Sequence, residues 1–281
     1  QSFTINVSNV NDEPSITTTA LNIINQDVTY SYMFAASDVD VGDTVTLAAA
    51  TKPSWLIFNA ATGVLSGTPT NSDVGTHSVV LTATDAAGAV DTQSFTITVS
   101  NTNDAPSITS SEVTSVNEDA AYSYTFEASD VDSGDTITLA AATKPSWLIF
   151  NAATGVLSGT PTNSDVGTHS VVLTATDAAG AVDTQSFTIT VSNTNDAPSI
   201  TSSEVTSVNE DAAYSYTFEA SDVDSGDTVT LAATTKPSWL TFNPATGVLS
   251  GTPTSSDVGT HAVVLTATDA AGAVDTQSFT I

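Results

Sequence analysis

The chain is built from a repeat of 92 residues. The segment K-P-S-W-L recurs with its tryptophan at Trp55, Trp147 and Trp239, and the two intervals (147 − 55 and 239 − 147) are both 92 residues. Residues 106–189 and 198–281 align without gaps and differ at six positions, one of which pairs Asn163 with Ser255. A period this long suits a self-sufficient β-sandwich of about 100 residues better than a solenoid unit, which needs a neighbour to bury its core.

The repeat also sets the predicted domain boundaries. Residues 1–8 match Gln93–Ser100 at seven of eight positions, so residues 1–13 are expected to be the last strand and linker of a preceding, truncated repeat. Residues 14–105, 106–197 and 198–281 are then repeats one, two and three, and the third lacks its C-terminal linker. We interpret the sequence as an excerpt from a tandem array.

Short alternating strands are expected in each repeat. Tyr122-Ser-Tyr-Thr-Phe-Glu-Ala and Phe187-Thr-Ile-Thr-Val alternate apolar and polar residues with the period of two that is typical of a half-buried strand. Val171-Val-Leu-Thr-Ala-Thr is predicted to be more buried, and glycines such as Gly155 and Gly180 mark turns. Because no long stretch has helical periodicity, we predict an all-β chain of tandem β-sandwiches with about seven strands per repeat.

The charge balance excludes several classes of partner. The chain holds 31 acidic residues against Lys52, Lys144 and Lys236, for a formal net charge of −28. Such a surface repels phosphate backbones, which excludes ordinary nucleic-acid binding. No apolar run approaches the 18 residues that a spanning helix needs, so no membrane insertion is expected of this segment. Cysteine is absent, which excludes disulfides and thiolate metal sites.

The acidic residues gather, by our threading of a sandwich, at the two ends of each repeat. In repeat two, Asp130, Asp132 and Asp177 are expected at the upper end, where strands meet the D-V-D and A-T-D turns. A second set is expected at the lower end beside the linker Asn193–Pro198, and it consists of Glu118, Asp119 and Asp165. If the repeats follow one another head to tail, each junction concentrates carboxylates from separate stretches of chain.

Such clusters predict a bound cation. Carboxylates held close together destabilise a fold unless a positive charge neutralises them, and lysine is too rare here to do so. A hard divalent ion with six to eight oxygen ligands is the natural partner, and flexible geometry favours Ca²⁺ over Mg²⁺. The alternative is that these residues only form turns and solubilise the chain, since Asp and Asn favour turns.

In combination, these motifs resemble the cadherin-like repeats of large bacterial surface adhesins, of the dystroglycan-type cadherin-like or "putative immunoglobulin-like" kind. The motifs are D-V-D at Asp130, A-T-D-x-x-G at Asp177, the linker N-T-N-D-A-P from Asn193, and the core segment from Pro145 to Thr168. The resemblance covers essentially the whole chain. It implies that the linker and the two facing repeat ends bind calcium together.

The resemblance also implies a ligand set for each junction. The junction of repeats two and three would use Glu118, Asn193, Asn195, Asp196, Asp222, Asp224 and Asp269, with Asp119 and Asp165 as further candidates. The junction of repeats one and two would use Asn101, Asn103, Asp104, Asp130, Asp132 and Asp177, with Gln26, Asp27 and Asp73 from repeat one. The half-site before repeat one would retain Asn9, Asn11, Asp12, Asp38, Asp40 and Asp85.

Two departures from the family pattern change what we expect. Gln26 stands where repeats two and three have Glu118 and Glu210, so the first junction should bind calcium more weakly, and Gln26→Glu should strengthen it. The DRE motif of animal cadherins is missing, and Asp165 in S-D-V-G is the candidate in its place.

The expected function is structural. Calcium-stiffened spacer repeats of a secreted or surface-anchored bacterial adhesin, extracellular and supporting cell adhesion or biofilm formation, fit the sequence best. We expect no enzyme, because no nucleophile–base pair is apparent. Two alternatives remain open: Trp147 and its equivalents could contact surface glycans rather than pack in the core, and the repeats could bind one another. His77, His169 and His261 recur singly and are expected to pack within strands.

Overall fold

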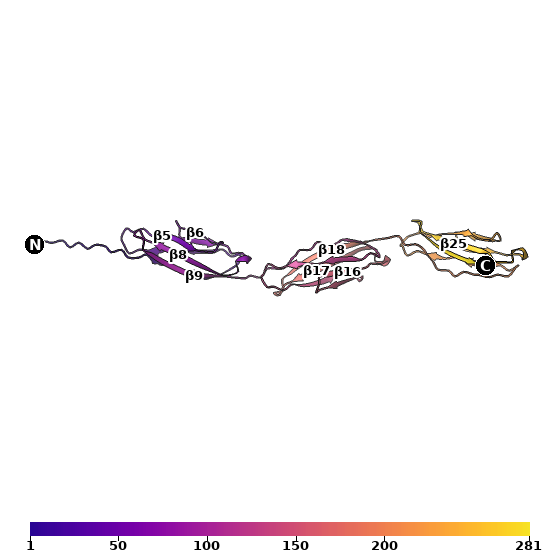
Figure 1. Ribbon diagram of the computed structural model, residues 1–281, viewed down its shortest axis with the longest axis horizontal. Coiled ribbons are helices and arrows are strands. Elements are labelled where there is room, and N and C mark those ends of the chain that lie inside the picture. Colours follow the sequence, from indigo (N-terminus) through magenta and orange to yellow (C-terminus); the bar gives the residue numbers. More distant parts are fainter. The chain divides into compact units, whose positions relative to one another are not determined.

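Three repeats of β-strands make up the chain, and the computed structural model describes all 281 residues. Repeat one holds β1 (Ser15–Ile16), β2 (Ile23–Asn25), β3 (Tyr30–Met33), β4 (Ala36–Ser37), β5 (Thr46–Thr51), β6 (Ile57–Asn59), β7 (Val64–Gly67), β8 (Gly75–Thr84) and β9 (Val90–Ser100) (Figure 1). Repeat two holds β10 (Ser107–Ile108), β11 (Ser115–Asn117), β12 (Tyr122–Thr125), β13 (Ala128–Ser129), β14 (Thr138–Thr143), β15 (Leu148–Asn151), β16 (Val156–Gly159), β17 (Gly167–Thr176) and β18 (Val182–Ser192). Repeat three holds β19 (Ser199–Ile200), β20 (Tyr214–Thr217), β21 (Ala220–Ser221), β22 (Thr230–Thr235), β23 (Leu240–Asn243), β24 (Val248–Gly251), β25 (Ala262–Thr268) and β26 (Val274–Thr280).

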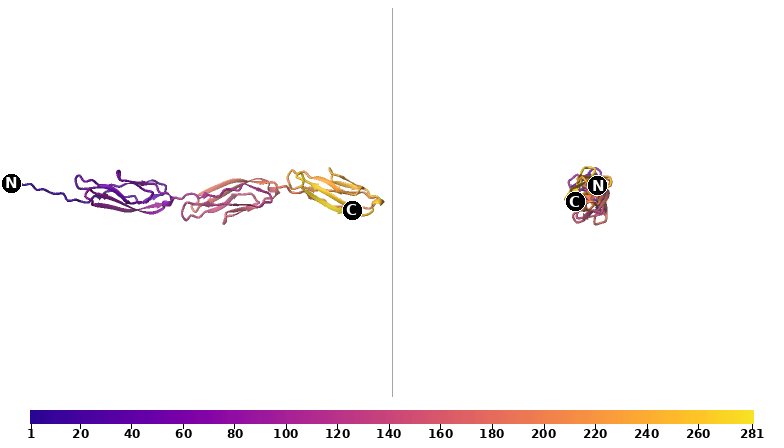
Figure 2. Two further views of the ribbon diagram at one scale, coloured as in Figure 1. Left: turned by 45° about the horizontal axis from the view of Figure 1, so that its top comes forward. Right: turned by 90° about the vertical axis from the view of Figure 1, so that its right-hand side faces the viewer.

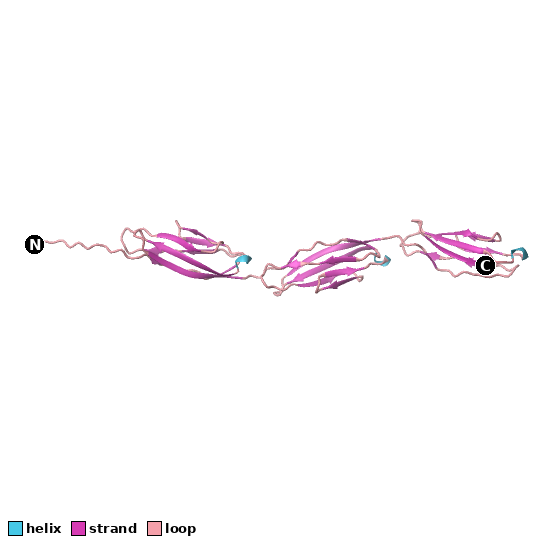
Figure 3. Ribbon diagram, viewed as in Figure 1, coloured by secondary structure: helices cyan, strands magenta, loops and turns pink.

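The all-β prediction is confirmed, with one short 3₁₀ turn per repeat as the helical content. These turns, η1 (Asn71–Asp73), η2 (Asn163–Asp165) and η3 (Ser255–Asp257), are the cyan segments of Figure 3. None of the helical segments has the length and apolarity needed to cross a membrane.

Each repeat is a sandwich of two main sheets plus a two-stranded pair. In repeat one, a four-stranded sheet of order β2-β9-β8-β5 faces a three-stranded sheet of order β3-β7-β6, and β1 pairs with β4. Repeat two has the same three sheets: β11-β18-β17-β14, β12-β16-β15 and β10-β13. Repeat three has β22-β25-β26, β20-β24-β23 and β19-β21. Figure 2 shows these strands from two further directions.

The structure resolves nine strands in repeats one and two, against about seven expected, because two of the expected strands are divided. β1 pairs antiparallel with β4 in the two-stranded sheet, whereas β2 belongs to the four-stranded sheet, where it pairs parallel with β9. β3 and β4 likewise belong to different sheets. Counting β1 with β2 and β3 with β4 returns the expected seven.

The alternating pattern produces the core. In β12 the residues alternate between buried and exposed, with Tyr122 and Tyr124 3% and 4% exposed, and Phe126 follows them into the core at 1%. Val171, Leu173 and Ala175 of β17 are fully buried, because this strand is central in its sheet. The corresponding residues of repeats one and three form equivalent clusters drawn from both main sheets. Each repeat therefore has its own hydrophobic core, and most of its acidic residues lie in the loops and turns between its strands.

The chain divides into two compact units whose boundary passes through repeat two. The first comprises Gln1–Ile108, Ala128–Thr138 and Ala175–Asp183, and the second comprises Thr109–Glu127, Leu139–Thr174 and Thr184–Ile281. Each unit contains one linker between two of the repeats 14–105, 106–197 and 198–281, together with the loops that contact that linker.

Candidate functional site

Three aspartates converge in the loop that follows β13. Carboxylate oxygens of Asp130, Asp132 and Asp135 lie within 4.8 Å of one another. The loop closes locally, because the Asp132 amide donates to Asp130 Oδ1 at 2.9 Å and the Asp135 amide to the Asp132 carbonyl at 3.2 Å. Gly134 supplies the positive φ of 92° that this turn requires. Sequence reasoning named the first two aspartates but not Asp135, the third acid of the same D-V-D-S-G-D motif.

The equivalent loops of repeats one and three recruit one further residue. Asp38 and Asp43 cluster with Asp85, and Asp222 and Asp227 cluster with Asp269, again within 4.8 Å. Asp85, Asp177 and Asp269 occupy the A-T-D turn, and Asp177 Oδ1 accepts from the Ala181 amide at 2.7 Å. The predicted meeting of the D-V-D and A-T-D turns at one end of a repeat is thus found. Asp43 and Asp227, like Asp135, escaped the sequence reasoning.

Each linker docks onto the repeat that follows it through the same hydrogen bonds. Asn103 Nδ2 donates to Asp177 Oδ2 at 2.8 Å, and the Asp104 amide donates to Asp132 Oδ2 at 2.8 Å. The equivalent bonds recur in the other two linkers: Asn11 to Asp85, the Asp12 amide to Asp40, Asn195 to Asp269, and the Asp196 amide to Asp224. In addition, Asn9 Nδ2 donates to Asp40 Oδ1 at 2.8 Å.

These donors stabilise the ionised carboxylates. The hydrogen bond from Asn103 lowers the pKa of Asp177, and the hydrogen bond from the Asp104 amide lowers the pKa of Asp132, to which Asn71 and Asn101 also contribute. In the other repeats, the pKa of Asp85 is lowered by Asn11, that of Asp269 by Asn195, and that of Asp224 by Asn163 with help from the Asp196 amide and Asn193. These five aspartates therefore stay negatively charged at neutral pH.

The turn after β11 brings a glutamate to the second linker. Glu118 is 2% exposed, and its Oε1 accepts from the Thr194 amide at 2.6 Å. Its carboxylate lies within 4.8 Å of those of Asp196, in the linker, and Asp224, in repeat three. Oε2 of Glu118 is buried and has no hydrogen-bond partner. Three stretches of chain thus meet at one oxygen-rich point, as the sequence analysis expected for this junction.

An unpaired buried carboxylate oxygen is costly unless a cation accompanies it. The same condition holds for Oδ2 of Asp38, Asp130 and Asp222, one in each D-V-D loop. All candidate metal-ligand atoms are oxygens of carboxylates, side-chain amides or the backbone, which are the ligands that Ca²⁺ prefers. The residues therefore fit a hard divalent cation.

The first linker differs at the position of the glutamate. Gln26 is equally buried, at 2% exposed, but its Nε2 donates to Asp104 Oδ2 at 3.0 Å and to the Thr102 carbonyl at 3.2 Å. An N–H group thus stands where the second linker has a carboxylate, and Gln26 Oε1 is left without a partner. This local difference supports the expectation of a weaker first junction.

Two asparagines that sequence reasoning passed over also reach these clusters. Asn71 Nδ2, from η1, donates to Asp104 Oδ2 at 3.0 Å and to Asp132 Oδ1 at 2.9 Å. Asn163 Nδ2, from η2, donates to Asp196 Oδ2 at 3.2 Å and to Asp224 Oδ1 at 2.9 Å. In sequence they look like ordinary turn formers, because their partners lie 33 and 61 residues further along the chain.

Other predicted ligands serve their own turns. Asp165 Oδ2 accepts from the amide and the hydroxyl of Thr162, at 2.9 and 2.8 Å, which closes η2 and lowers the pKa of Asp165. Asp73 closes η1 in the same way. Asp27 and Asp119 adopt φ of 58°, which aspartate tolerates better than most residues. None of these four belongs to a carboxylate cluster.

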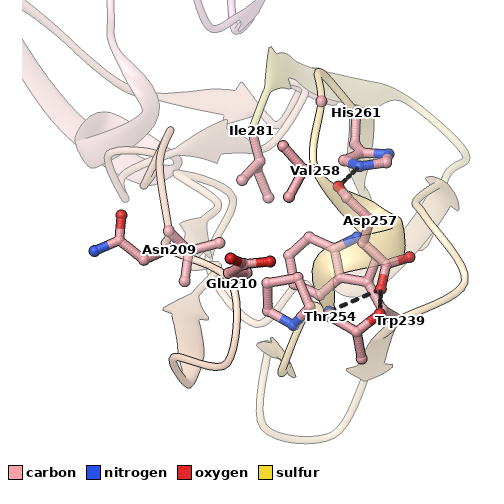
Figure 4. A pocket seen from close by; sticks show the side chains of 11 residues that line it. Asn209, Glu210, Trp239, Thr254, Asp257, Val258, His261 and Ile281 are labelled. Atoms are coloured by element: carbon pink, nitrogen blue, oxygen red, sulfur yellow. Dashed lines mark hydrogen bonds between the residues drawn. The ribbon is translucent and has the colours of Figure 1, made fainter.

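The tryptophans pack against other aromatic residues. Trp147 is half-buried and makes edge contacts with Tyr122 and His169 at ring-centroid distances of 5.8 and 6.0 Å, and the other repeats have the same contacts. His169 Nε2 hydrogen-bonds the Asp165 carbonyl at 2.6 Å. In repeat three, Trp239 borders a cavity of about 260 Å³ together with Glu210, Asp257 and His261 (Figure 4). This packing supports a core role for the indole rings.

The family described as "Putative Ig domain" matches residues 13–100, 105–192 and 197–281. Among relatives of known description, the "Serine-rich adhesin for platelets" of Staphylococcus aureus strain MRSA252 is 31% identical over 144 residues. That match covers 51% of this chain and 10% of the relative, and for strain MSSA476 it covers 6% of the relative. The alignment therefore spans a tenth or less of these relatives.

Solved cadherin structures share the fold. Protocadherin gamma B2 extracellular cadherin domains 1–5 superpose with a TM-score of 0.58 at 18% identity, covering 97% of this chain and 60% of that structure. Mouse cadherin-23 EC22-24 has a TM-score of 0.52 at 18% identity, covering 96% of this chain and 98% of that structure. At these identities the likeness shows the β-sandwich repeat fold alone.

Proposed function

The chain belongs to the "Putative Ig domain" family, and from that premise we propose that it is a calcium-stiffened spacer of a bacterial surface adhesin. Its repeats, bounded at 14–105, 106–197 and 198–281, would hold a terminal binding region away from the cell and so support adhesion or biofilm formation. The 31% identity to a staphylococcal surface adhesin supports an extracellular setting.

One observation carries the calcium part of the proposal. The buried Glu118 carboxylate has an unpaired oxygen and lies within 4.8 Å of carboxylates from the linker and from the next repeat. Glu118, Asp196 and Asp224 would hold one ion at this junction. Asp222, Asp227 and Asp269 would hold another ion, at the end of repeat three that contacts the linker. Asp130, Asp132 and Asp135 would hold an ion in repeat two. An ion bound only when the linker and both repeats are in place stabilises that arrangement by mass action.

The test is small-angle X-ray scattering of the 281-residue chain in EDTA and in millimolar calcium. We expect calcium to raise the maximum dimension and to restrict bending, with half-effect at about 10⁻⁴–10⁻³ M, the range of extracellular modules. Asp224→Asn is the variant that should reduce this response, because it removes one carboxylate from the junction cluster. Coincident profiles, together with an unchanged thermal melt in calcium, would show that the acidic clusters bind no metal.

A further inference from the structure

Asn163 connects three parts of the second unit: repeat two, which carries it in η2, the linker at Asp196, and repeat three at Asp224. Both partners are carboxylates, which accept hydrogen bonds and cannot donate them. The amide nitrogen, not the amide oxygen, must therefore face the two acids.

The position of this amide offsets a repulsion. The Asp196 and Asp224 carboxylates lie within 4.8 Å of each other, and two carboxylates held this close repel each other. One NH₂ group placed between them supplies two N–H donors, one to each carboxylate. Hydrogen bonds to charged acceptors are stronger than neutral ones. The two acids can thus stay close before any cation arrives.

The first unit repeats the arrangement with Asn71, Asp104 and Asp132. The same side chain thus makes the same pair of bonds in both units. The bonds from each linker to its following repeat are identical in all three linkers and do not involve this residue. The asparagine contributes instead to the tie with the preceding repeat.

We propose that Asn71 and Asn163 are amide latches that preassemble the junction carboxylates in the metal-free protein and thereby raise calcium affinity. The affinity part rests on the proposed function, whereas the metal-free part stands without it. The latch makes metal-free junctions partly ordered, so that calcium tightens an existing arrangement.

The replacement Asn163→Ser tests the latch without disturbing η2. Repeat three has Ser255 at the equivalent position, and η3 forms there with the same Thr254–Asp257 capping contacts. Asn151→Ser is the matched control, because it makes the same chemical change at the exposed end of β15 in repeat two. The chain has no cysteine, so spin labels attach only where cysteines are introduced.

Labels at Thr143→Cys and Thr235→Cys, both exposed strand ends, bracket the second junction in the full chain. We expect Asn163→Ser to broaden the interlabel distance distribution in EDTA, and Asn151→Ser to leave it unchanged. We also expect the calcium midpoint for narrowing this distribution to rise by at least about three- to tenfold. That factor is the equivalent of one typical hydrogen bond, and Asn163→Ser removes two.

An unchanged distribution in EDTA would overturn the latch, even where calcium narrows the distribution of the parent chain and the proposed function survives. A lower calcium midpoint in Asn163→Ser would overturn it as well, because the amide would then compete with the metal. If calcium has no effect on the parent chain, the proposed function and the affinity part fail, and the EDTA comparison alone decides the metal-free latch.

Discussion

Exchanging Gln26 and Glu118 should exchange the calcium affinities of the two junctions. Glu118 lies within 4.8 Å of two other carboxylates, whereas Gln26 donates a hydrogen bond to Asp104. At 4.8 Å, two unit charges repel by about 0.9 kcal/mol in a water-like dielectric and by about 3.5 kcal/mol at an effective dielectric constant of 20. The lower value gives about 1.7 kcal/mol for the two pairs that Glu118 forms.

A bound divalent cation offsets this repulsion through its attraction to each carboxylate, and we take about 1.7 kcal/mol as the scale of the contribution that Glu118 makes to calcium affinity. Glu118→Gln should therefore lower calcium affinity at the second junction by about twentyfold, since 1.4 kcal/mol corresponds to a factor of ten. Gln26→Glu should raise affinity at the first junction by a similar factor. In EDTA the effect of Gln26→Glu has the opposite sign. The variant loses the N–H donor to Asp104 and adds a negative charge, so the first junction should become less ordered without calcium.

The assay is terbium luminescence sensitised by one tryptophan at a time. Trp239 and Glu210 border the same cavity in repeat three. Trp147 and Glu118 are the equivalent residues of repeat two, and Trp55 and Gln26 those of repeat one, so Trp147 should report on the second junction and Trp55 on the first. Chains that retain a single tryptophan, with phenylalanine at the other two positions, assign each titration to one junction. Glu127→Gln is the matched control, because it removes the charge of an exposed glutamate in repeat two. Midpoints that stay within twofold after both exchanges, or that move in the opposite directions, would refute the reasoning.

Two further predictions concern the sandwich itself. Gly159→Ala should destabilise repeat two by about 1–3 kcal/mol, because a Cβ there would clash with the Trp147 carbonyl oxygen. Urea unfolding should show this loss against Gly134→Ala, where nothing lies within 4 Å of the added carbon and the cost is that of a positive φ alone; equal losses would contradict the steric argument. Burial raises the pKa of Tyr30, Tyr122 and Tyr214 to about 12, so the stabilisation from their neutral form is complete below pH 10 and is lost as pH rises from 10 to 12. The thermal unfolding temperature in EDTA should therefore fall over this interval, and it should fall less in a chain with phenylalanine at all three positions.

Local patterns in the sequence predicted most of the sandwich, because alternation reports directly on which side of a strand is buried. Tyr122, Tyr124 and Phe126 are buried as their spacing indicates. The division of the first strand was not predictable in this way. β2 leaves β1 to pair in parallel with β9, a partner about 75 residues away that no local signal identifies. The predicted count of about seven strands is therefore correct when β1 and β2, and likewise β3 and β4, are each counted as one strand, and it is low when every strand is counted separately.

The candidate site was predictable where ligand type and turn type coincide. The D-V-D and A-T-D turns do meet, and the linker asparagines do reach Asp177 and Asp269. Asp165 shows the opposite case, because its carboxylate closes a turn with Thr162, three residues away, and the sequence does not distinguish a capping acid from a ligand. Asn163 was missed because its role depends on two distant carboxylates. The sequence thus identified the acidic turns that meet at a junction, but not every hydrogen bond that connects one repeat to the next.

The distribution of sequence differences indicates which part of each junction is adjustable. All three linkers make the same bonds to the following repeat, so a linker and the repeat after it form one recurring structural unit. Among the contacts to the preceding repeat, the asparagine bonds of Asn71 and Asn163 recur, whereas the turn residue differs: Gln26 supplies an N–H donor and Glu118 a carboxylate. Gln26 and Glu118 lie in turns and not in the hydrophobic core. Exchanging glutamine and glutamate at this position therefore changes the charge of a junction without repacking a sandwich. Under the proposed calcium binding, a tandem array of nearly identical repeats would therefore set the calcium response of each junction separately, by a single residue.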